Sequence, residues 1–394
     1  MIACTICVQR EEFMILMIQQ KYILERPLRL MDDIWDAIII GGGPAGSTVA
    51  RYAAKGGAKI LVIDRRKEIG NPLQCGELVP TNEELRRLCP DVPNINELFQ
   101  TPKEAISRRT NEMNLVTPSG KRLVYPFKGQ ILYRPIHDQK LVEVAKKNGA
   151  QYLTESRVND ISENTVFLKN GDKLNAKIIV GCGGPHDPLR KKFWTENSLN
   201  IAVNFVIMEG DFENIVELYF GSTAPGGYAW MIPKKGGANI GIGIQTRFSK
   251  GKSLNTMAQD FFQRFKGKIT YKGGGVLPMS GSIRNFTKGN YMLVGDSAGM
   301  VLPSNGAGIT TAMIGGRIAG QVIAEHIESK VALSEYQKRW NLQMGKVMKY
   351  SKRGMAWGGM MFRSPDSLIN ASFNRLTKPI IWRAITCKPM FGLF

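Results

Sequence analysis

Histidine, cysteine and long apolar runs are scarce in this sequence of 394 residues, and each scarcity excludes a class of protein. The 3 His residues are scattered, so no spacing indicates a metal site and no Ser/His/Asp pattern indicates a hydrolase. The 6 Cys residues are too few for a disulfide scaffold, which indicates an intracellular, reducing compartment. Charge interrupts every apolar stretch before the ~18 residues that a transmembrane helix requires.

The first thirty residues also lack the features of a secretory signal. Arg10, Glu11 and Glu12 interrupt them, and neither a charged start nor a cleavage site is present. Cys4 and Cys7 form an isolated CxxC, which is a weak indication of a metal site without a second pair. We interpret residues 1–31 as an extension outside the folded core and expect the native chain to begin at Met31, and we expect no metal.

Positive charge is abundant and unevenly distributed, with a formal net charge of +20. Between Lys338 and Phe394 there are eleven Lys or Arg residues, a single acid, Asp366, and three of the 6 Trp residues. Basic residues interleaved with aromatic ones suit an anionic membrane surface, although a solvated basic face would have the same composition. No nucleic-acid-binding motif accompanies the charge, so we expect no nucleic-acid partner. The prediction is a cytoplasmic protein, peripheral on the inner face of the cell membrane.

A dinucleotide-binding motif is the first strong signal. The apolar run 35–40 predicts a buried parallel strand, and a helix of small residues follows up to Lys55. A second predicted strand over 58–63 ends at an acid, Asp64. Between the first strand and the helix stand three glycines in GxGxxG spacing, Gly41, Gly43 and Gly46.

Each residue of this motif has a physical role. Gly41 permits the tight turn, Gly43 lets a pyrophosphate approach the backbone, and Gly46 lets the helix pack closely on the strand. The helix N-terminus offers free N–H groups to the phosphates. Asp64 can hold the ribose hydroxyls. The intervening Ala45 and the neighbouring Arg65 complete this first set of predicted cofactor residues.

A second, distant stretch resembles the FAD half-site of the large flavoprotein group that includes the aromatic hydroxylases. The predicted strand 291–294 runs into Gly295 and Asp296, and Gly306 and Gly308 precede a helix that begins near Ile309. In that group the Asp holds the ribityl chain, and the N-terminus of the helix faces the flavin. A positive helix end stabilises an anionic reduced flavin. The resemblance therefore implies FAD, bound in part by Asp296, Gly306, Gly308 and Ile309.

Two further positions bear on this resemblance. Arg134, four residues before Asp138, resembles the arginine that leans on the FAD, although a capping arginine on the surface is the alternative. The usual Gly-Ala-Asp-Gly after the strand at 177–180 is replaced by residues 181–184, in which Gly183 takes the place of the Asp while Arg190 is kept. This departure leaves the electron donor open between ferredoxin and NADPH.

Two motifs narrow the resemblance to the geranylgeranyl reductase family. Residues 225–233 followed by Gly241 and Gly243 resemble the PxxYxWxFP…GxG signature, with Ile232 in place of Phe. Residues 74–77 resemble the QCGE loop of the family. The resemblance spans residues 32–324 and is nearest to the archaeal branch that reduces digeranylgeranylglycerophospholipids. It implies a prenylated glycerophospholipid as substrate and a reduced electron carrier as partner.

The first of these motifs also predicts a groove. Tyr228, Trp230 and Ile232 alternate along a strand-like stretch and therefore share one face, which with Pro233 is expected to line an apolar groove for a prenyl chain. A plain sheet core is the alternative interpretation.

The expected chemistry requires a proton donor beside this groove. An isolated alkene accepts hydride only with protonation, so an acid must stay protonated next to apolar surface. Cys75 is the first candidate, because a thiol in apolar surroundings has a raised pKa, and Glu77 and Tyr228 are the others. Cys75 and Gly76 are also expected to contact the flavin. An inert buried Cys75 remains the alternative.

We therefore expect an α/β protein whose main function is FAD-dependent saturation of isoprenoid C=C bonds. An FAD monooxygenase or halogenase and a non-catalytic membrane-associated flavoprotein remain alternatives, the former because Ile232 also fits halogenases. A Rossmann-like FAD-binding domain of the aromatic-hydroxylase type is predicted from residues 32–105, 130–190 and 286–330. A mostly antiparallel sheet domain is predicted from 106–129 and 191–285, and a basic helical region over 331–394 is expected to close the groove or dock on the membrane.

Overall fold

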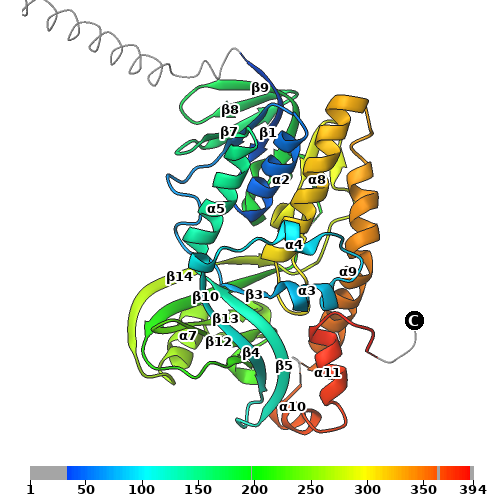
Figure 1. The fold of residues 1–394 in the computed structure, drawn as a ribbon. Coiled ribbons are helices and arrows are strands. Elements are labelled where there is room, and N and C mark those ends of the chain that lie inside the picture. The colour runs from blue at the N-terminus through cyan, green and yellow to red at the C-terminus, as the bar shows by residue number, and fades with distance from the viewer. Residues whose placement is uncertain (1–32, 197, 362–363, 391–394) are drawn as a thin grey trace, which may run out of the picture.

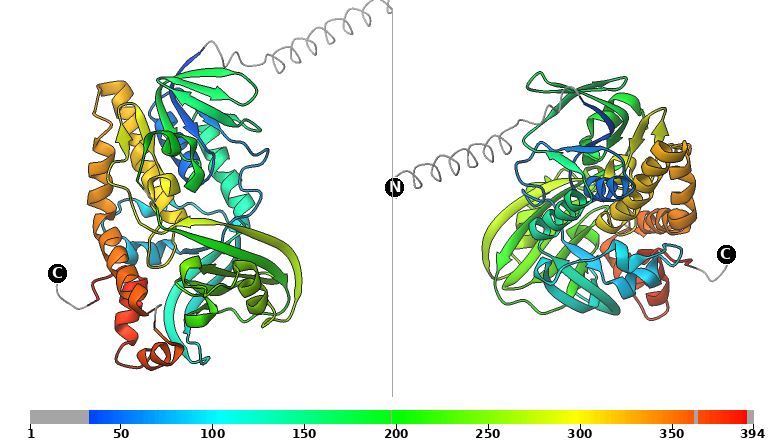
Figure 2. Two further views of the ribbon diagram at one scale, coloured as in Figure 1. Left: turned by 180° about the vertical axis from the view of Figure 1, so that it is seen from behind. Right: turned by 45° about the horizontal axis from the view of Figure 1, so that its top comes forward.

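Two sheets and a long C-terminal helix organise the chain (Figure 1). The structure, a computed structural model, describes residues 33–196, 198–361 and 364–390. One lobe surrounds a largely parallel sheet, the other surrounds a largely antiparallel sheet, and helix α9 (Glu335–Met361) runs along both lobes (Figure 2). The predicted fold class is thereby confirmed. The predicted extension, residues 1–31, lies outside the described residues.

The parallel sheet carries the dinucleotide motif. Its strand order is β15-β16-β9-β1-β2-β6, with the β7–β8 hairpin attached to β9. Strand β1 pairs in parallel with β2 and β9, and all three are rich in buried Ile and Val. Such apolar runs are typical of strands covered on both faces. The bounds are β1 Ile34–Ile40, β2 Ile60–Ile63, β6 Gln151–Leu153, β7 Val158–Ser162, β8 Thr165–Leu168, β9 Lys173–Gly181, β15 Thr287–Lys288 and β16 Tyr291–Leu293.

The second sheet has the order β14-β10-β13-β12-β11-β4-β5-β3. Each neighbouring pair along this order is antiparallel except β11 and β4, which are parallel. The bounds are β3 Leu78–Pro80, β4 Ile106–Val116, β5 Arg122–Leu132, β10 Asn200–Glu209, β11 Val216–Tyr219, β12 Tyr228–Lys234, β13 Gly237–Ile244 and β14 Lys268–Pro278.

Strand β3 lies in a segment that we expected in the FAD-binding domain, but it extends the second sheet. Leu78 pairs with Ile131 of β5, and Pro80 pairs with Gly129. The loop that contains Cys75 leads directly into β3, so the pairing attaches that loop to the second lobe. Strand β5 also continues three residues beyond the expected boundary at 129.

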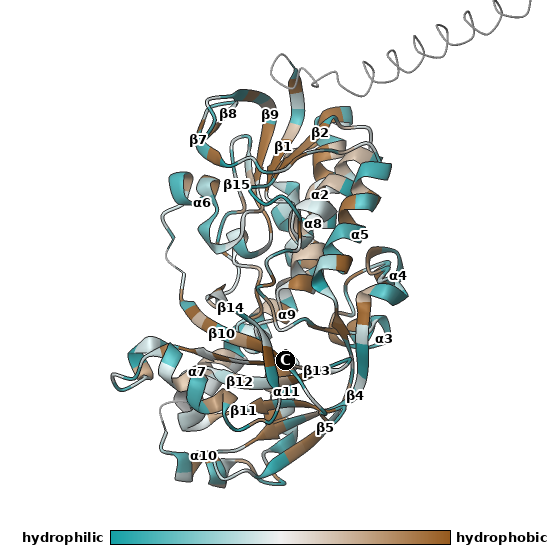
Figure 3. Cartoon of the chain, turned by 90° about the vertical axis from the view of Figure 1, so that its left-hand side faces the viewer, coloured by the Kyte–Doolittle hydropathy of each residue, from teal (hydrophilic) through white to brown (hydrophobic). Residues whose placement is uncertain are grey.

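The helices cover the parallel sheet and close the end of the second lobe. Figure 3 shows the contrast between the apolar strands β1 and β2 and the hydrophilic outer helix α6. None of the described helices has both the length and the apolar character that crossing a bilayer requires. The bounds are α2 Pro44–Lys55, α3 Asn82–Leu88, α4 Ile95–Leu98, α5 Arg134–Lys147, α6 Pro188–Phe193, α7 Leu254–Phe262, α8 Ile309–Ser329, α10 Asp366–Ser372 and α11 Lys378–Ile385.

Candidate functional site

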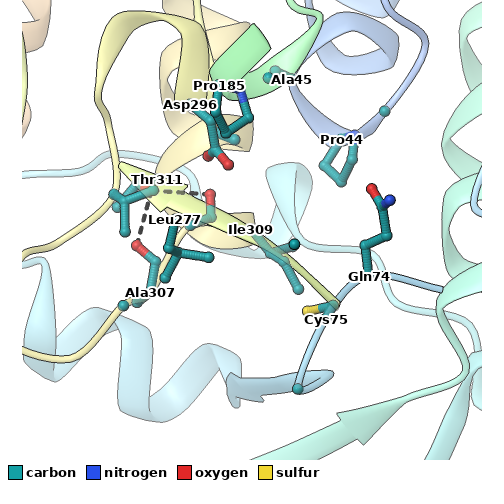
Figure 4. Close-up of a pocket in the computed structure, with 18 of the residues that line it drawn as sticks. Pro44, Ala45, Gln74, Cys75, Pro185, Leu277, Asp296, Ala307, Ile309 and Thr311 are labelled. Carbon is teal, nitrogen blue, oxygen red and sulfur yellow. Dashed lines mark hydrogen bonds between the residues drawn. The ribbon is translucent and has the colours of Figure 1, made fainter. Parts of the chain in front are cut away.

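A cavity of about 1170 Å³ is lined by residues of both lobes and of the C-terminal helices. This volume exceeds the ~300–1,000 Å³ of an ordinary small-molecule site, so the cavity can take a cofactor and a second ligand. Figure 4 shows Pro44, Cys75, Asp296 and Ile309 around one part of it. The predicted cofactor residues that line it are Gly41, Gly43, Ala45, Asp64, Arg65, Cys75, Gly76, Arg134, Asp296, Gly306, Gly308 and Ile309.

The three glycines of the motif meet different constraints. Gly41 has φ +100°, and a Cβ there would lie 2.5 Å from the carbonyl oxygen of Cys182. A Cβ at Gly46 would lie 1.8 Å from the carbonyl oxygen of Gly41, so this residue permits the packing of α2 on β1 and does not line the cavity. A Cβ at Gly43 would meet no protein atom within 4 Å. Gly43 therefore leaves space for a ligand at the N-terminus of α2.

Asp64 lies at the end of β2 beside this helix end. The N–H of Gly42 donates to Asp64 Oδ2 at 2.8 Å, and the Arg66 guanidinium donates to both carboxylate oxygens. Burial acts to raise the pKa of Asp64, but the hydrogen bonds and charge of Arg66 hold it below its ordinary value. The carboxylate is therefore ionised and oriented at the cavity wall.

The N-terminus of α8 is a second helix end in the same cavity. Gly306, with φ +73°, and Gly308 lead into the helix, and no side chain caps its first N–H groups. Ile309, Thr310 and Thr311 of the first turn line the cavity. Free N–H groups and the helix dipole favour negative charge at this position.

Asp296 stands close to this helix end, because a Cβ added at Gly308 would lie 3.4 Å from its Oδ1. Burial raises the pKa of its carboxyl to about 6, and the positive charge of Arg134 only partly offsets this rise. No described residue donates a hydrogen bond to the carboxylate. The side chain is half-buried and lines the cavity, so a ligand there can donate to its carboxylate.

Arg134 lies at the start of α5 and is held by Asp138. Its guanidinium donates to the two carboxylate oxygens at 3.0 and 2.8 Å, and His137 contacts the same carboxylate. Arg134 also interacts with the Cys75 thiol. The residue that we expected near the flavin is thus fixed between Asp138 and the loop at 74–77.

A buried network holds that loop. Glu77, with φ +68°, forms an ion pair with Lys234, the last residue of β12. Asn239 donates to Glu77 at 3.2 Å and to the carbonyl oxygen of Cys75 at 2.8 Å, and accepts from the indole of Trp230 at 2.9 Å. The Cys75 thiol in turn accepts from the N–H of Glu77 at 3.1 Å. Sequence reasoning missed Lys234 and Asn239, because neither belongs to the quoted motif residues.

The three candidate acids lie in different surroundings. Burial raises the pKa of the Cys75 thiol, although the charge of Arg134 opposes the rise. Burial also raises the pKa of Tyr228 to about 12, but its hydroxyl donates to the carbonyl oxygen of Asn305 at 2.6 Å. Lys234 and Asn239 bind Oε2 of the Glu77 carboxylate, whereas Oε1 is buried without a hydrogen-bond partner among the described residues. All three line the cavity, but the Cys75 thiol has no acceptor for its proton among the described contacts, whereas Tyr228 donates to Asn305 and Glu77 is ion-paired with Lys234.

Strand β12 brings three of the four predicted groove residues together. Tyr228, Trp230 and Ile232 share one face and line the cavity, as period-two alternation predicts. Pro233 does not line the cavity, because the same alternation turns it to the opposite face. The groove assignment of Pro233 was therefore wrong.

Apolar side chains from several elements continue this face. They come from β10, β14, α9 and the C-terminal segment, and they are Ile201, Val203, Phe205, Leu277, Val347, Met355, Trp382 and Ile385. Trp382 stacks on Tyr125 of β5 with ring centroids 4.5 Å apart. Asn305, which also lines the cavity, donates to the carbonyl oxygen of Ile385 at 2.8 Å. The C-terminal helices thus form part of the cavity wall.

A carboxylate also reaches the position where Gly183 replaces the usual Asp. Asp187 accepts from the N–H of Gly183 at 2.7 Å and from that of Arg190 at 3.0 Å, which caps α6. A Cβ at Gly183 would lie 2.8 Å from the Asp187 carboxylate. The Asp187 carboxylate thus lies against Gly183, but it caps α6 and does not line the cavity.

Comparison with known proteins agrees with this geometry. The family described as geranylgeranyl reductase catalytic domain matches residues 198–276, and that described as NAD(P)-binding Rossmann-like domain matches residues 39–78. A structure titled as a geranylgeranyl bacteriochlorophyll reductase-like protein from Thermoplasma acidophilum has a TM-score of 0.75 at 25% identity, covering 90% of this chain and 92% of that one. The flavin-dependent brominase Bmp2 has a TM-score of 0.65 at 16% identity over 90% of this chain and 94% of its own, which shows a shared fold alone.

Fold and cavity together place the chain in the class of two-lobed flavoproteins with a Rossmann-like domain. Within this class, it is 31% identical over 390 residues to digeranylgeranylglycerophospholipid reductase 3 of Methanosphaera stadtmanae, which covers 88% of this chain and 94% of that protein. It is 32% identical over 348 residues to the Methanosarcina acetivorans reductase of the same name, covering 80% of this chain and 82% of that one. The chain belongs to the digeranylgeranylglycerophospholipid reductase family, which confirms the resemblance seen in the sequence.

Proposed function

We propose that this protein is an FAD-dependent reductase that saturates the isoprenoid C=C bonds of geranylgeranyl groups on glycerophospholipids. One observation carries the proposal: a single cavity joins two uncapped helix N-termini at one end to an aromatic, apolar face at the other. The first end suits a phosphate-bearing cofactor, and the second suits a prenyl chain. The names of the relatives support the same substrate.

The residues at the first end fit FAD. Gly43 leaves room for a pyrophosphate at the N-terminus of α2, and Asp64 is ionised for a ribose. Asp296 is a carboxylate without a donor, as a site for ribityl hydroxyls requires. The N-terminus of α8 favours the negative charge of a reduced flavin ring. FAD, when reduced, supplies the hydride.

The chain's own residues then have to supply the proton and orient the alkene. Cys75 is the proposed acid or proton relay, since burial keeps it a thiol and it faces the cavity. Glu77 and Tyr228 act as positioning residues in this proposal, because Oε2 of Glu77 is ion-paired with Lys234 and the Tyr228 hydroxyl donates to the carbonyl oxygen of Asn305. Trp230 and Ile232, with Tyr228, present the apolar face that aligns the chain.

Two partners complete the proposal. The first is a reduced carrier, ferredoxin or NADPH, which would supply the electrons to the flavin. An anionic membrane surface holds the lipid substrate, which agrees with the positive charge of the C-terminal region.

A mass-shift assay tests the proposal. The FAD-loaded protein is incubated anaerobically with a geranylgeranylated glycerophospholipid and dithionite, and the lipid is analysed by mass spectrometry. A gain of two mass units for each C=C bond, absent without FAD, is the expected result. No gain from flavin-loaded protein would contradict it, and a hydroxylated or halogenated product formed with oxygen would favour the monooxygenase or halogenase alternative.

A further inference from the structure

The corner between α10 and α11, residues 366–383, carries apolar side chains that the fold leaves in solvent. It lies at the far end of the molecule from the parallel sheet (Figure 1). Leu368 is 58% exposed and Leu376 is 86% exposed, the highest value among the large apolar side chains of the described residues. Two such residues within nine positions of one another form a local apolar surface.

These leucines are not misplaced core residues. The inner side of the corner is already filled by Ile369, Phe373 and Ile381, which are buried against β4 and β5. The turn is fixed as well, because Asn374 Oδ1 accepts from the N–H groups of Leu376 at 2.9 Å and Thr377 at 3.1 Å. These bonds fix the backbone of Leu376 in a turn that leaves its side chain in solvent.

Basic residues lie at the corner. Arg375 is exposed beside Leu376, whereas the ammonium of Lys378 lies 5.2 Å from the centroid of the Tyr125 ring and that of Lys121 donates to the carbonyl oxygen of Phe373 at 2.8 Å. The acid of this segment, Asp366, is half-buried and accepts from the N–H and the hydroxyl of Ser222. Basic residues around exposed leucines match the headgroups and chains of an anionic bilayer.

The corner also adjoins the apolar end of the cavity. A small apolar pocket of about 60 Å³ lies between α9, α10 and α11, behind the exposed leucines. It shares Ser304, Met355 and Ile385 with the main cavity. A lipid chain that leaves a bilayer at this corner is thus next to the wall of the site.

We propose that the α10–α11 corner docks on an anionic lipid bilayer, with Leu368 and Leu376 among the lipid chains and the basic side chains at the headgroups. The bilayer then presents the prenylated substrate to the adjoining end of the cavity, and this second part rests on the proposed function. Both leucines lie outside the linings of the two cavities, so their role is separable from binding inside the site.

Vesicle sedimentation of the full chain tests the docking. The probe is phosphatidylglycerol vesicles, with phosphatidylcholine vesicles in parallel, and the variant is L368E/L376E. The matched control is L342E, since Leu342 is 76% exposed on α9, away from the corner. We expect the double variant to bind phosphatidylglycerol at least ~10-fold more weakly than wild type, because each leucine buries a whole side chain. Control and wild type should bind alike, and salt should weaken both.

Equal binding by the double variant and the control would overturn the proposal. So would wild type that binds neither kind of vesicle, which would favour a protein partner for the corner.

The rate of lipid reduction, measured on two forms of the substrate, distinguishes a docking role of the corner from a role in catalysis. With substrate embedded in vesicles, the double variant should lose at least ~10-fold in rate, whereas with detergent-dispersed substrate it should match the control. Equal rates of the double variant and the control on vesicles would overturn the delivery role. Vesicle binding that depends on the leucines, with no turnover of either substrate form, would support docking and contradict the proposed reductase activity.

Discussion

Glu77, which lines the cavity, forms an ion pair with Lys234 behind it, and their side chains are only 1% and 8% exposed. Glu77 belongs to the loop that presents Cys75, and Lys234 ends the strand that presents Tyr228, Trp230 and Ile232. The pair therefore sets the position of the proposed proton donor relative to the proposed substrate face. A left-handed backbone at Glu77, φ +68°, is kept in place by the same contact.

Replacing Lys234 by Met should destabilise the protein by ~3–5 kcal/mol, because the Glu77 carboxylate would stay buried without its cation. Urea unfolding measures the loss. The matched control is Lys140→Met, which breaks the exposed pair with Glu143 and should cost less than ~1 kcal/mol. The double variant E77Q/K234M should recover part of the loss. An equal loss of unfolding free energy in the two single variants would show that the buried pair stabilises the protein no more than the exposed one.

The two glycines at positions 43 and 46 should respond differently to the same added methyl group. Gly43 has φ −67°, which alanine adopts, and its Cβ meets no protein atom, so Gly43→Ala should fold normally but bind FAD weakly. Gly46→Ala brings a Cβ against the backbone of Gly41 and should cost at least ~1–3 kcal/mol of stability. Thermal unfolding and titration of the apoprotein with FAD distinguish the two effects. Tight FAD binding by Gly43→Ala would refute a pyrophosphate site there.

Cys75→Ala should lower turnover ~100-fold or more while FAD stays bound, since it removes the proposed acid but none of the predicted phosphate or ribityl contacts. Cys89→Ala is the matched control, because Cys89 is a second thiol in the cavity lining, and burial raises its pKa to about 12. Reduction of the lipid and the flavin absorbance spectrum are measured together. Unchanged turnover in Cys75→Ala would remove this thiol from the mechanism.

Local motifs were predictable from the sequence because their physical causes are local. The start of α8 at Ile309 follows from the glycines before it, and β1, α2 and β2 follow from the apolar run, the small residues and Asp64. The same holds for the shared face of Tyr228, Trp230 and Ile232. Each depends on residues close together in the chain.

Contacts between distant segments were not predictable in the same way. Glu77 and Lys234 are 157 positions apart, and no spacing rule pairs them. The sequence also gave no sign that Asp187 would place its carboxylate against Gly183, since this depends on how the chain turns before α6. The C-terminal region was expected to close the groove or dock on a membrane, but only the fold assigns Trp382 to the cavity wall and Leu376 to the surface.

The affinity for FAD should depend on pH through Asp296. Its pKa in the free protein is about 6, above the ordinary value of 3.8, so the carboxyl is mostly protonated below pH 6. Ribityl hydroxyls donate to the ionised form, so binding must release this proton when the pH is low. Affinity should therefore rise with pH, by up to ~10-fold per unit below pH 6, and level off above it.

The isosteric variant Asp296→Asn isolates this effect, because its amide does not titrate. It should bind FAD more weakly than wild type at pH 8, since a neutral acceptor replaces a charged one, and its affinity should change little between pH 5 and 8. Quenching of flavin fluorescence during titration of the apoprotein measures both profiles. Parallel pH profiles in wild type and variant would mean that another group controls binding. A wild-type affinity that falls as pH rises would contradict the assignment of Asp296 as an ionised acceptor for the cofactor.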